Sequence, residues 1–255
     1  MGVSKQAWLA IAVGGAAVAA AVAIVVAALL RQPRIAGTTP QDRIATICLL
    51  ADEQPFGAGD VVAEAAAGEP DPSVRQAALV ALARFADPRH RRTVEKAADD
   101  PSAMIRAAAA TTLGVYQDEA AADRLGHMAT ADAEVRVRLG AVAGLGRNST
   151  SLSLVWLLET AEKDPDPQVQ FMAIKELHRR LGMKYIGKDP SKEKDNWPRQ
   201  AAFVVEYLKE YPPVQEAYAK AGRALVPRPE YRPTRYVEPK EGGRPWESAA
   251  PKNHH

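Results

Sequence analysis

The sequence predicts an all-α protein with three parts: an N-terminal transmembrane helix, a solenoid of stacked helical hairpins and an extended Pro-rich C-terminal tail. Three observations lead to this prediction. Residues 7–30 contain no charged side chain, a stretch that begins at Asp71 recurs about every 30 residues, and residues 226–255 contain six prolines. Apolar residues make up 47% of the chain but aromatic residues only 6%, so small aliphatic side chains, which favour closely packed helices, dominate.

The overall charge and the cysteine content exclude several classes of site. The 33 basic and 31 acidic residues leave a net charge of +2, which predicts no strong field for nucleic acid or anionic lipid. Because Cys48 is the sole cysteine, the chain can form neither an intramolecular disulfide nor a cysteine-based metal cage or haem attachment. Cys48 follows Ile44 by one helical turn in an apolar run, which predicts a buried side chain. An intermolecular bridge is the alternative.

Residues 1–6 are a short N-terminal tail, and residues 7–30 are predicted to form the transmembrane helix. From Trp8 to Leu30 such a helix would be about 34 Å long, enough to cross a bilayer core of about 30 Å. A cleavable signal peptide is the alternative. Its apolar region would be shorter, however, and a small-residue cleavage site would replace the observed "RQPR". An uncleaved anchor is therefore the favoured interpretation.

The orientation of this span is nearly undecided, because Lys5 precedes it and Arg31 and Arg34 follow it. A short N-terminus carrying Lys5 favours a body outside the cytoplasm. The Ala- and Arg-rich composition suggests a bacterial source, so we expect a single-pass protein of the inner membrane with a periplasmic body. Gly14 and Gly15 would let a partner helix approach the span closely, although they could equally be filler in a simple anchor.

Residues 40–183 follow a linker of residues 31–39 and repeat one helical pattern. Each copy starts with a branched apolar residue and carries further apolar residues four and eight positions later, which form one stripe of a helix. The copies start at Val74, Ile105, Val135 and Val169, with a fainter one at Ile44. Each of the four clear copies is preceded by an Asp, usually followed by Pro, that is expected to cap the first turn. These residues are Asp71, Asp100, Asp132 and Asp166.

A second, shorter helix is expected between successive copies. The predicted ranges are 58–67, 89–98, 119–130 and 151–163. Each unit of about 30 residues is therefore a helical hairpin, which cannot bury its apolar stripe alone. Stacking successive hairpins buries the stripes in one continuous core, which is the architecture of an α-solenoid.

The first copy, D-P-x-V-R-x-x-A from Asp71 to Ala78, resembles the HEAT-repeat family, specifically the short HEAT-like repeats also found in phycobilisome lyases. The second copy has one extra residue, the third lacks Pro, and the fourth has Gln170 in place of Arg. The resemblance covers about residues 40–183 and implies an α-solenoid, but no particular function, because these scaffolds serve unrelated tasks. It also implies that Arg75, Arg106 and Arg136 pair with an Asp of the adjacent unit. A ladder for a phosphate or carboxylate ligand is the alternative.

Residues 184–225 are interpreted as a loop followed by capping helices for the solenoid. The loop is rich in Gly, Pro and charge. A helix is expected over 198–211, stopped by Pro212 and Pro213 and followed by a short helix to Leu225. The aromatic side chains of this region, Trp197, Phe203 and Tyr207, are expected in the core of the cap, with stacking on a cofactor as the alternative.

Residues 226–255 favour an extended polyproline conformation and cannot build a core of their own. This tail carries Arg and aromatic side chains, which are common interface anchors. They are Tyr231, Arg232, Arg235, Tyr236, Arg244 and Trp246. The segment is thus a candidate for binding a partner, and a disordered tail is the alternative.

No motif for catalysis, a cofactor or a metal is found in the sequence. The histidines are not at metal-ligand spacing, apart from the terminal pair His254 and His255, and no G-x-x-x-x-G-K-[ST] loop is present. His178 lies near a helix end, where a cation would complement the helix dipole. Acidic residues near hairpin ends are interpreted as solvated turns and caps, with a cation site as the alternative. They are Asp99, Asp100, Glu162, Asp164 and Asp166.

These features predict a membrane-anchored protein–protein interaction scaffold, serving as a non-catalytic accessory subunit of a larger bacterial membrane complex. The expected partners are other protein subunits and the bilayer through residues 7–30. Nucleic acid, a small-molecule substrate and a cofactor are not expected. Two alternatives stay open. One is an enzyme of the lyase type that attaches a chromophore, against which the anchor and the single cysteine argue. The other is a membrane-tethered assembly factor that holds its client transiently.

Overall fold

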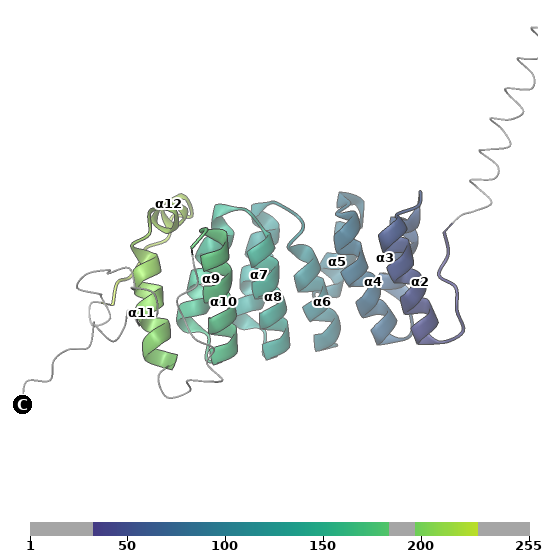
Figure 1. Cartoon of the computed structure of the whole chain (residues 1–255), viewed down its shortest axis with the longest axis horizontal. Coiled ribbons are helices and arrows are strands. Elements are labelled where there is room, and N and C mark those ends of the chain that lie inside the picture. The colour runs from purple at the N-terminus through teal and green to yellow at the C-terminus, as the bar shows by residue number, and fades with distance from the viewer. Residues whose placement is uncertain (1–32, 184–196, 229–255) are drawn as a thin grey trace, which may run out of the picture.

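The computed structural model describes residues 33–183 and 197–228, which are helical with short connections and contain no strand (Figure 1). The helices are α2 (Pro40–Glu53), α3 (Ala58–Gly68), α4 (Pro72–Phe85), the 3-10 turn η1 (Pro88–His90), α5 (Arg91–Ala97), α6 (Ala103–Leu113), α7 (Glu119–Ala131), α8 (Val135–Arg147), α9 (Ser151–Lys163), α10 (Pro167–Arg180), α11 (Trp197–Lys209) and α12 (Pro212–Lys220). The all-α prediction is confirmed for the described residues.

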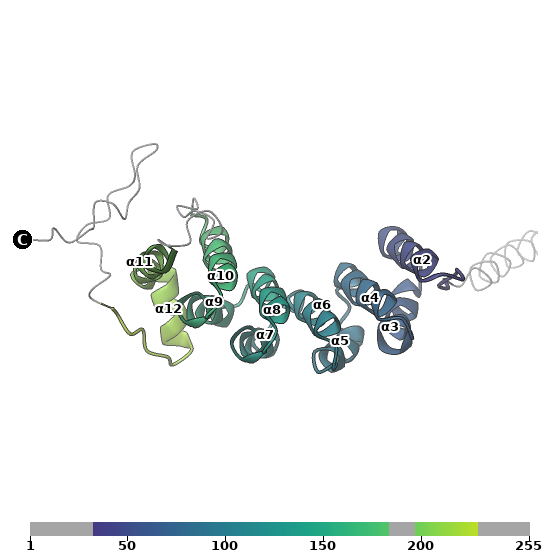
Figure 2. The same cartoon turned by 90° about the horizontal axis from the view of Figure 1, so that it is seen from below.

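The helices of the repeats form two rows. Helices α2, α4, α6, α8 and α10 pack side by side in an inner row, and α3, α5, α7 and α9 cover one side of it in an outer row. Figure 2 shows that the inner row lines the hollow side of an arc. Buried apolar residues from successive hairpins join in one continuous core, as expected when each hairpin buries its stripe against the next.

The four shorter helices occur close to where the sequence pattern places them, as α3, η1 with α5, α7 and α9. The second is the least regular. Pro88 starts a 3-10 turn whose first N–H group is capped by Asp87, and α5 itself has only 7 residues. The hairpin prediction is thus confirmed in each of the four units.

The register predicted for the third copy is wrong by two residues. Val135 is partly exposed, whereas Val137 is 0% exposed. The buried stripe of α8 is therefore Val137, Ala141 and Leu145. In the stretch "VRVR", the apolar stripe could begin at either valine, because both are followed by apolar residues at helical spacing. Packing against α6 and α10 decides which valine is buried.

The Asp residues before the stripes have two different roles. Asp71 and Asp166 cap α4 and α10, because their side chains accept hydrogen bonds from N–H groups of the first turn. The expected caps at Asp100 and Asp132 are not found, since α6 and α8 start two residues later. Their carboxylates instead accept the N–H groups at positions 102 and 134, at 2.8 and 3.0 Å.

Cys48 is exposed, contrary to the prediction that it is buried. The residues of α2 that face the core are Ile47, Leu50 and Ala51. Helix α2 stands at the end of the inner row, so its far side has no neighbouring repeat among the described residues. An apolar run in an end helix therefore does not show which of its faces is buried.

Helices α6 and α8 approach each other closely through glycine. A Cβ atom added at Gly144 would lie 2.5 Å from the carbonyl oxygen of Ala110, and one at Gly140 would lie 2.7 Å from that of Ala107. Neither position can take a side chain without moving the backbones apart, so the two glycines set the distance between the two central helices of the arc.

No helix among the described residues is long and apolar enough to cross a bilayer. The predicted transmembrane segment 7–30, with Gly14 and Gly15, lies outside the described residues, as does most of the predicted tail.

Candidate interaction surface

Equivalent side chains on the inner row reach back to the start of their own helices. In each case the side chain donates to the carbonyl oxygen six residues earlier, at 2.9 to 3.0 Å. The donors are Arg75, Arg106, Arg138 and Gln170. These hydrogen bonds satisfy a carbonyl group in the connection before each inner-row helix. They also show which residues of the four copies are structurally equivalent.

Two of these arginines also form ion pairs with the next repeat. The Nε atoms of Arg106 and Arg138 lie 2.8 Å from carboxylate oxygens of Asp132 and Asp164, respectively. Arg138 is only 8% exposed and Asp164 only 6%. The pairing implied by the family resemblance is thus confirmed for Arg106.

The pairing expected of Arg136 is wrong, because Arg138 takes that role and Arg136 is exposed. Arg75 makes no ion pair within residues 33–183 and 197–228, so the expectation is wrong there too. Where pairing occurs, the hydrogen bond from Arg106 lowers the pKa of Asp132. The paired cations are occupied by the protein's own carboxylates, which leaves no free ladder for an anionic ligand at these positions.

The exposed or partly exposed side chains on the side of α4, α6 and α8 that faces away from the outer row line the hollow side of the arc, because the other sides of these helices pack against their row neighbours and the outer row. They recur at a helical spacing that continues onto α10. We call this set the hollow face. It comprises Val80, Arg84, Thr111, Arg136, Leu139, Ala143, Arg147, Phe171, Met172, Lys175 and Arg179.

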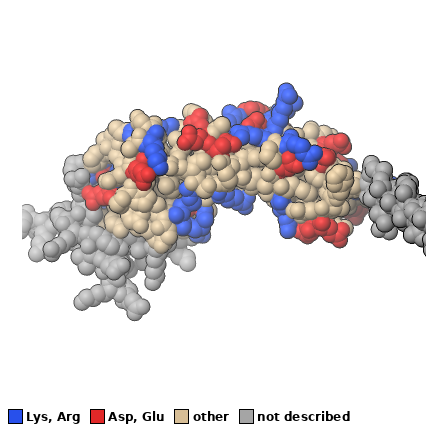
Figure 3. All heavy atoms as spheres, turned by 90° about the horizontal axis from the view of Figure 1, so that it is seen from above, with Lys and Arg blue, Asp and Glu red and all other residues tan. Residues whose placement is uncertain are grey.

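The hollow face is basic. Helices α4, α6 and α8 contain no Asp or Glu, and α10 contains only Glu176. Each outer-row helix, by contrast, carries at least one carboxylate. Figure 3 shows basic side chains along the hollow lower edge, with acidic ones at its right-hand end, and both signs mixed over the outer edge. The net charge of +2 conceals this segregation. The scarcity of acids in α4, α6, α8 and α10 was the sequence signal that could have revealed it.

Some cations of the hollow face are already paired. Arg84 forms an ion pair with Asp52 of α2, and Arg179 lies 2.7 Å from Glu176. Within the described part of the chain, Arg136, Arg147 and Lys175 form no ion pair. These three lie on α8 and α10, next to partly exposed apolar side chains such as Leu139 and Phe171. This end of the hollow face therefore combines free positive charge with apolar surface.

A buried ion-pair network lies at the C-terminal end of the body. The Nζ atom of Lys209, on α11, is 2.7 Å from a carboxylate oxygen of Glu162 on α9 and 2.7 Å from one of Glu206. It also donates to the carbonyl oxygen of Val226 at 2.7 Å. Arg228 completes the network, with its Nε atom 3.3 Å from Glu162 and its N–H group donating to Glu206 at 2.8 Å. The network therefore fastens the chain at the start of the predicted tail.

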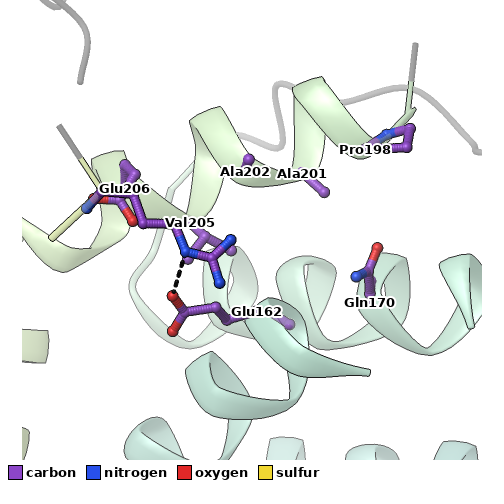
Figure 4. Close-up of a pocket in the computed structure, with 9 residues that line it drawn as sticks. Glu162, Gln170, Pro198, Ala201, Ala202, Val205 and Glu206 are labelled. Atoms are coloured by element: carbon purple, nitrogen blue, oxygen red, sulfur yellow. Dashed lines mark hydrogen bonds and ion pairs between the residues drawn. The ribbon is translucent and has the colours of Figure 1, made fainter. Parts of the chain in front are cut away.

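A small pocket of about 210 Å³ opens beside this network, between α9, α10 and α11 (Figure 4). Its described lining consists of Ala161, Glu162, Gln170, Pro198, Ala201, Ala202, Val205, Glu206 and Arg228. The charged groups among these are engaged with one another or with Lys209, and none of the lining residues is Ser, Cys, His or Lys. The described lining thus offers no hydroxyl, thiol, imidazole or amine nucleophile, and its two carboxylates are held in ion pairs.

Helix α11 closes the end of the core, as predicted. Trp197 and Phe203 are 2% and 5% exposed, whereas Tyr207, which was also expected in the core of the cap, is only partly buried. The indole N–H of Trp197 donates to the side-chain oxygen of Gln170 at 2.8 Å, and its ring lies edge-on to Phe171. Gln170 is the equivalent of Arg138 in the next repeat. Trp197 therefore contacts Gln170 from the following helix, as Asp164 contacts Arg138 from the following repeat. The Pro pair at 212 and 213 both ends the preceding segment and forms the first turn of α12.

Three sequence-based interpretations of charged groups are wrong. His178 is 1% exposed, and burial lowers its pKa, so it is not a solvated cation at the helix end. Asp164 and Glu162 are not solvated turn residues, because each is largely buried in an ion pair. The alternative of a cation site gains no support in the described residues, where no group of three His, Cys, Asp or Glu side chains is placed to hold a metal.

The tail residues predicted to bind a partner lie outside the described residues. They are Tyr231, Arg232, Arg235, Tyr236, Arg244 and Trp246. The structure adds two features, the hollow face and the ion-pair network around Lys209. The sequence did not predict either of them as a functional site.

Comparison with known proteins identifies the repeats. The family model for HEAT repeats matches residues 59–146, which run from α3 to α8 and include the Arg106–Asp132 pair. No curated protein matches the chain. Residues 59–146 therefore match HEAT repeats, and the hairpins on either side of them continue the same two-row packing.

Proposed function

We propose that this chain is a membrane-anchored protein–protein interaction scaffold that serves as an accessory subunit of a larger bacterial membrane complex. HEAT repeats typically form non-catalytic scaffolds for protein partners, which supports the coarser part of the proposal. The observation that carries it is the hollow face, where cations of α8 and α10 without an ion-pair partner among the described residues lie beside apolar side chains. Such a surface is larger than a small-molecule site and suits an extended protein segment.

The chemistry of the hollow face favours a partner segment that carries acidic and apolar side chains. Arg136, Arg147 and Lys175 offer positive charge that no carboxylate of the described residues neutralises, although Arg147 donates to the carbonyl oxygen of Thr111 at 3.4 Å, and Leu139 and Phe171 offer apolar contact. Complementary charge steers association and selects partners, while the buried apolar groups supply much of the affinity. An amphipathic helix with one acidic edge is the simplest segment with these properties.

The anchor belongs to the same proposal. Residues 7–30 are long enough and apolar enough to span the inner membrane once, with the body in the periplasm. In this arrangement Gly14 and Gly15 pack against a partner helix, and the Arg and aromatic residues of the tail form a second contact. The anchor thus confines the scaffold to the membrane that also holds the complex. This confinement raises the effective concentration of a weakly bound partner.

The proposal is tested by purifying the full chain from native membranes in mild detergent and identifying the retained proteins by mass spectrometry. The double variant Arg136→Glu/Lys175→Glu reverses two charges of the hollow face. The matched control Arg92→Glu/Lys96→Glu reverses two exposed charges on the outer-row helix α5. We expect the wild type and the control to retain the same partner and the hollow-face variant to lose at least tenfold of it. Recovery of a lone monomer in the wild-type sample contradicts the proposal.

Two alternatives to a permanent subunit give different results in the same preparation. A permanent subunit is present at a fixed ratio to its partner in the mature complex. A transient assembly factor is retained only with immature complexes. A lyase-type enzyme is expected to carry or transfer a tetrapyrrole, which is visible in the absorbance spectrum of the purified complex.

A further inference from the structure

We propose that the turn between α2 and α3, with Phe56 at its tip, lies in the headgroup region of the membrane that holds the anchor. This inference rests on the proposed function, because it takes residues 7–30 as the transmembrane segment. It adds an orientation for the body: the α2–α3 end of the arc lies against lipid, and the rest of the arc extends away from that point.

Phe56 is the most exposed large apolar side chain of the described residues, at 100% of its surface. Phe is one of the side chains that interfacial segments bury at the boundary between headgroups and acyl chains. Leu49 and Cys48 are also exposed on the last turns of α2, next to this turn in the chain. Besides Phe56, this end of the arc therefore carries two further exposed apolar or weakly polar side chains.

The turn that carries Phe56 is well defined by its backbone and hydrogen bonds. Gln54 and Gly57 adopt left-handed φ values of 46° and 81°. The Gln54 side chain donates to the carbonyl oxygen of Arg84 at 3.2 Å, and the N–H group of Ala58 donates to the carbonyl oxygen of Pro55 at 2.9 Å. The ring is thus presented outward from a turn that is tied to α4.

The turn lies beside the point where the body meets the proposed anchor. A Cβ atom added at Gly57 would lie 3.8 Å from Cγ of Pro33, the first described residue. The predicted span ends at Leu30, so the intervening chain reaches at most about 11 Å even when fully extended. The headgroup layer on each side of a bilayer is about 5–8 Å thick. Phe56 is therefore within reach of this layer whenever residues 7–30 span the membrane.

The linker is also fixed to the body, which limits how far the body can turn away from the bilayer. The hydroxyl group of Thr46 donates to the carbonyl oxygen of Ala36 at 2.9 Å, and Ile35 packs against the core. Only residues 31 and 32 separate the predicted span from this attached segment. A short tether to a fixed point keeps the α2–α3 end nearest the lipid.

The charges around the turn make the proposed contact apolar rather than electrostatic. Glu53 and Asp60 are exposed near the tip, and Arg34 is exposed on the linker. Carboxylates at this position gain nothing from anionic lipid. We therefore expect the contact to form on uncharged phosphatidylcholine and not to be strengthened by phosphatidylglycerol.

The test uses the full chain reconstituted in phosphatidylcholine vesicles. A Cys48→Ser background carries one new cysteine, at Phe56→Cys, Val80→Cys or Val226→Cys, labelled with an environment-sensitive fluorophore. Val80 and Val226 are controls because they are 50% and 69% exposed in the middle and at the far end of the described body. We expect the label at position 56 to shift to the blue and to be quenched at least twofold by lipid with a nitroxide near the headgroup. The labels at positions 80 and 226 should stay unquenched.

The outcomes separate the failure of this inference from the failure of the proposed function. If alkaline carbonate releases the chain from the vesicles, the anchor itself is wrong and the proposed function fails in its membrane part. If the chain resists carbonate but the label at position 56 emits as in water, the lipid contact is wrong and the anchor stands. A label that is shielded only in native membranes, and is not quenched by nitroxide lipid, assigns the turn to a protein partner and also overturns the inference.

Discussion

At the residue scale, Arg138 and Asp164 form an ion pair that is almost wholly removed from water. Arg138 also donates to carbonyl oxygens of residues 132 and 133, and Asp164 accepts the N–H group of Asp166. The pair therefore links α8, the connection before it and the following repeat. Removing one member leaves the other charge buried without compensation, which is the costly case for a buried ion pair.

We predict that Arg138→Ala destabilises the body by about 3–5 kcal/mol, because it leaves the carboxylate of Asp164 buried and unpaired. Arg136→Ala removes the same chemical group two residues away on the exposed side of α8 and should change the free energy of unfolding by about 0.5 kcal/mol or less. Urea unfolding followed by circular dichroism measures both variants. Equal effects at the two positions would show that the register of α8 described here is wrong.

His178 gives a prediction for the pH dependence of stability. Burial lowers its pKa in the folded protein, while its Nδ1 atom lies 2.8 Å from the carbonyl oxygen of Ile174. A histidine with a lowered folded pKa stabilises the protein above its unfolded pKa, near 6.5, and that contribution is lost as the pH falls below this value. We expect the unfolding free energy of the wild type to fall between pH 7.5 and pH 5, and that of His178→Gln to fall less. A steeper decline in the variant would contradict the assignment.

The sequence predicted the positions of the helices better than it predicted which of their residues are buried. The motif located the equivalent arginines of the first two copies, Arg75 and Arg106, because each is flanked by one branched residue at the right spacing, although only Arg106 forms the expected ion pair. In "VRVR" it selected Arg136, and in α2 it predicted that Cys48 is buried. Both errors concern which face of a correctly predicted helix is buried. That choice depends on the neighbouring helices, which local periodicity does not contain.

At the scale of elements, the contact between α6 and α8 depends on glycine. Gly144→Ala would normally favour a helix by about 1 kcal/mol, but here the new Cβ atom would lie 2.5 Å from the carbonyl oxygen of Ala110. We predict a net loss of about 1–3 kcal/mol in unfolding free energy. Gly68→Ala at the end of α3, where nothing lies within 4 Å, should be neutral or stabilising. Thermal unfolding of the two variants tests this, and a stabilised Gly144→Ala protein would refute the close contact.

The cap formed by α11 and α12 depends on Lys209. We predict that Lys209→Met leaves Glu162 and Glu206 without their shared cation and opens the cap locally, at a cost of about 3–5 kcal/mol. Hydrogen exchange should rise in α11 and α12 but not in α6 and α8, because repeats contact mainly their neighbours. Lys220→Met, which removes a cation from an exposed pair with Glu216, serves as the control. Uniform exchange across all helices in the Lys209 variant would contradict a locally held cap.

The elements themselves were largely predictable. Apolar spacing, Asp-Pro starts and the recurrence of the pattern located the paired helices of the repeats, because each of these signals is local. The assignment of α11 to the cap also followed from the sequence. The ion-pair network could not be predicted, because Glu162 and Lys209 are far apart in the chain and meet only when α11 packs on α9.

At the scale of the whole molecule, the two rows separate charge. The sequence total of +2 averages the basic helices α4, α6, α8 and α10, among which only Glu176 is acidic, with carboxylates on the outer row, on α2 and in the connections. The prediction of a weak overall field followed correctly from the total, but it overlooked the local field of the hollow face. Acid-poor helices alternate with acid-containing helices along the chain. Because alternate helices lie in the same row, the acid-poor helices come together and form one basic surface.

The central claim is that the hollow face binds a partner protein. Site-specific photocrosslinking in native membranes tests it most directly, with a photoreactive phenylalanine analogue placed at Val80 or Lys175 on the hollow face or at Lys96 on the outer row. We predict a discrete crosslinked protein from both hollow-face positions and little or none from position 96. Crosslinks from position 96 alone, or none from positions 80 and 175 in the intact membrane, would contradict the account.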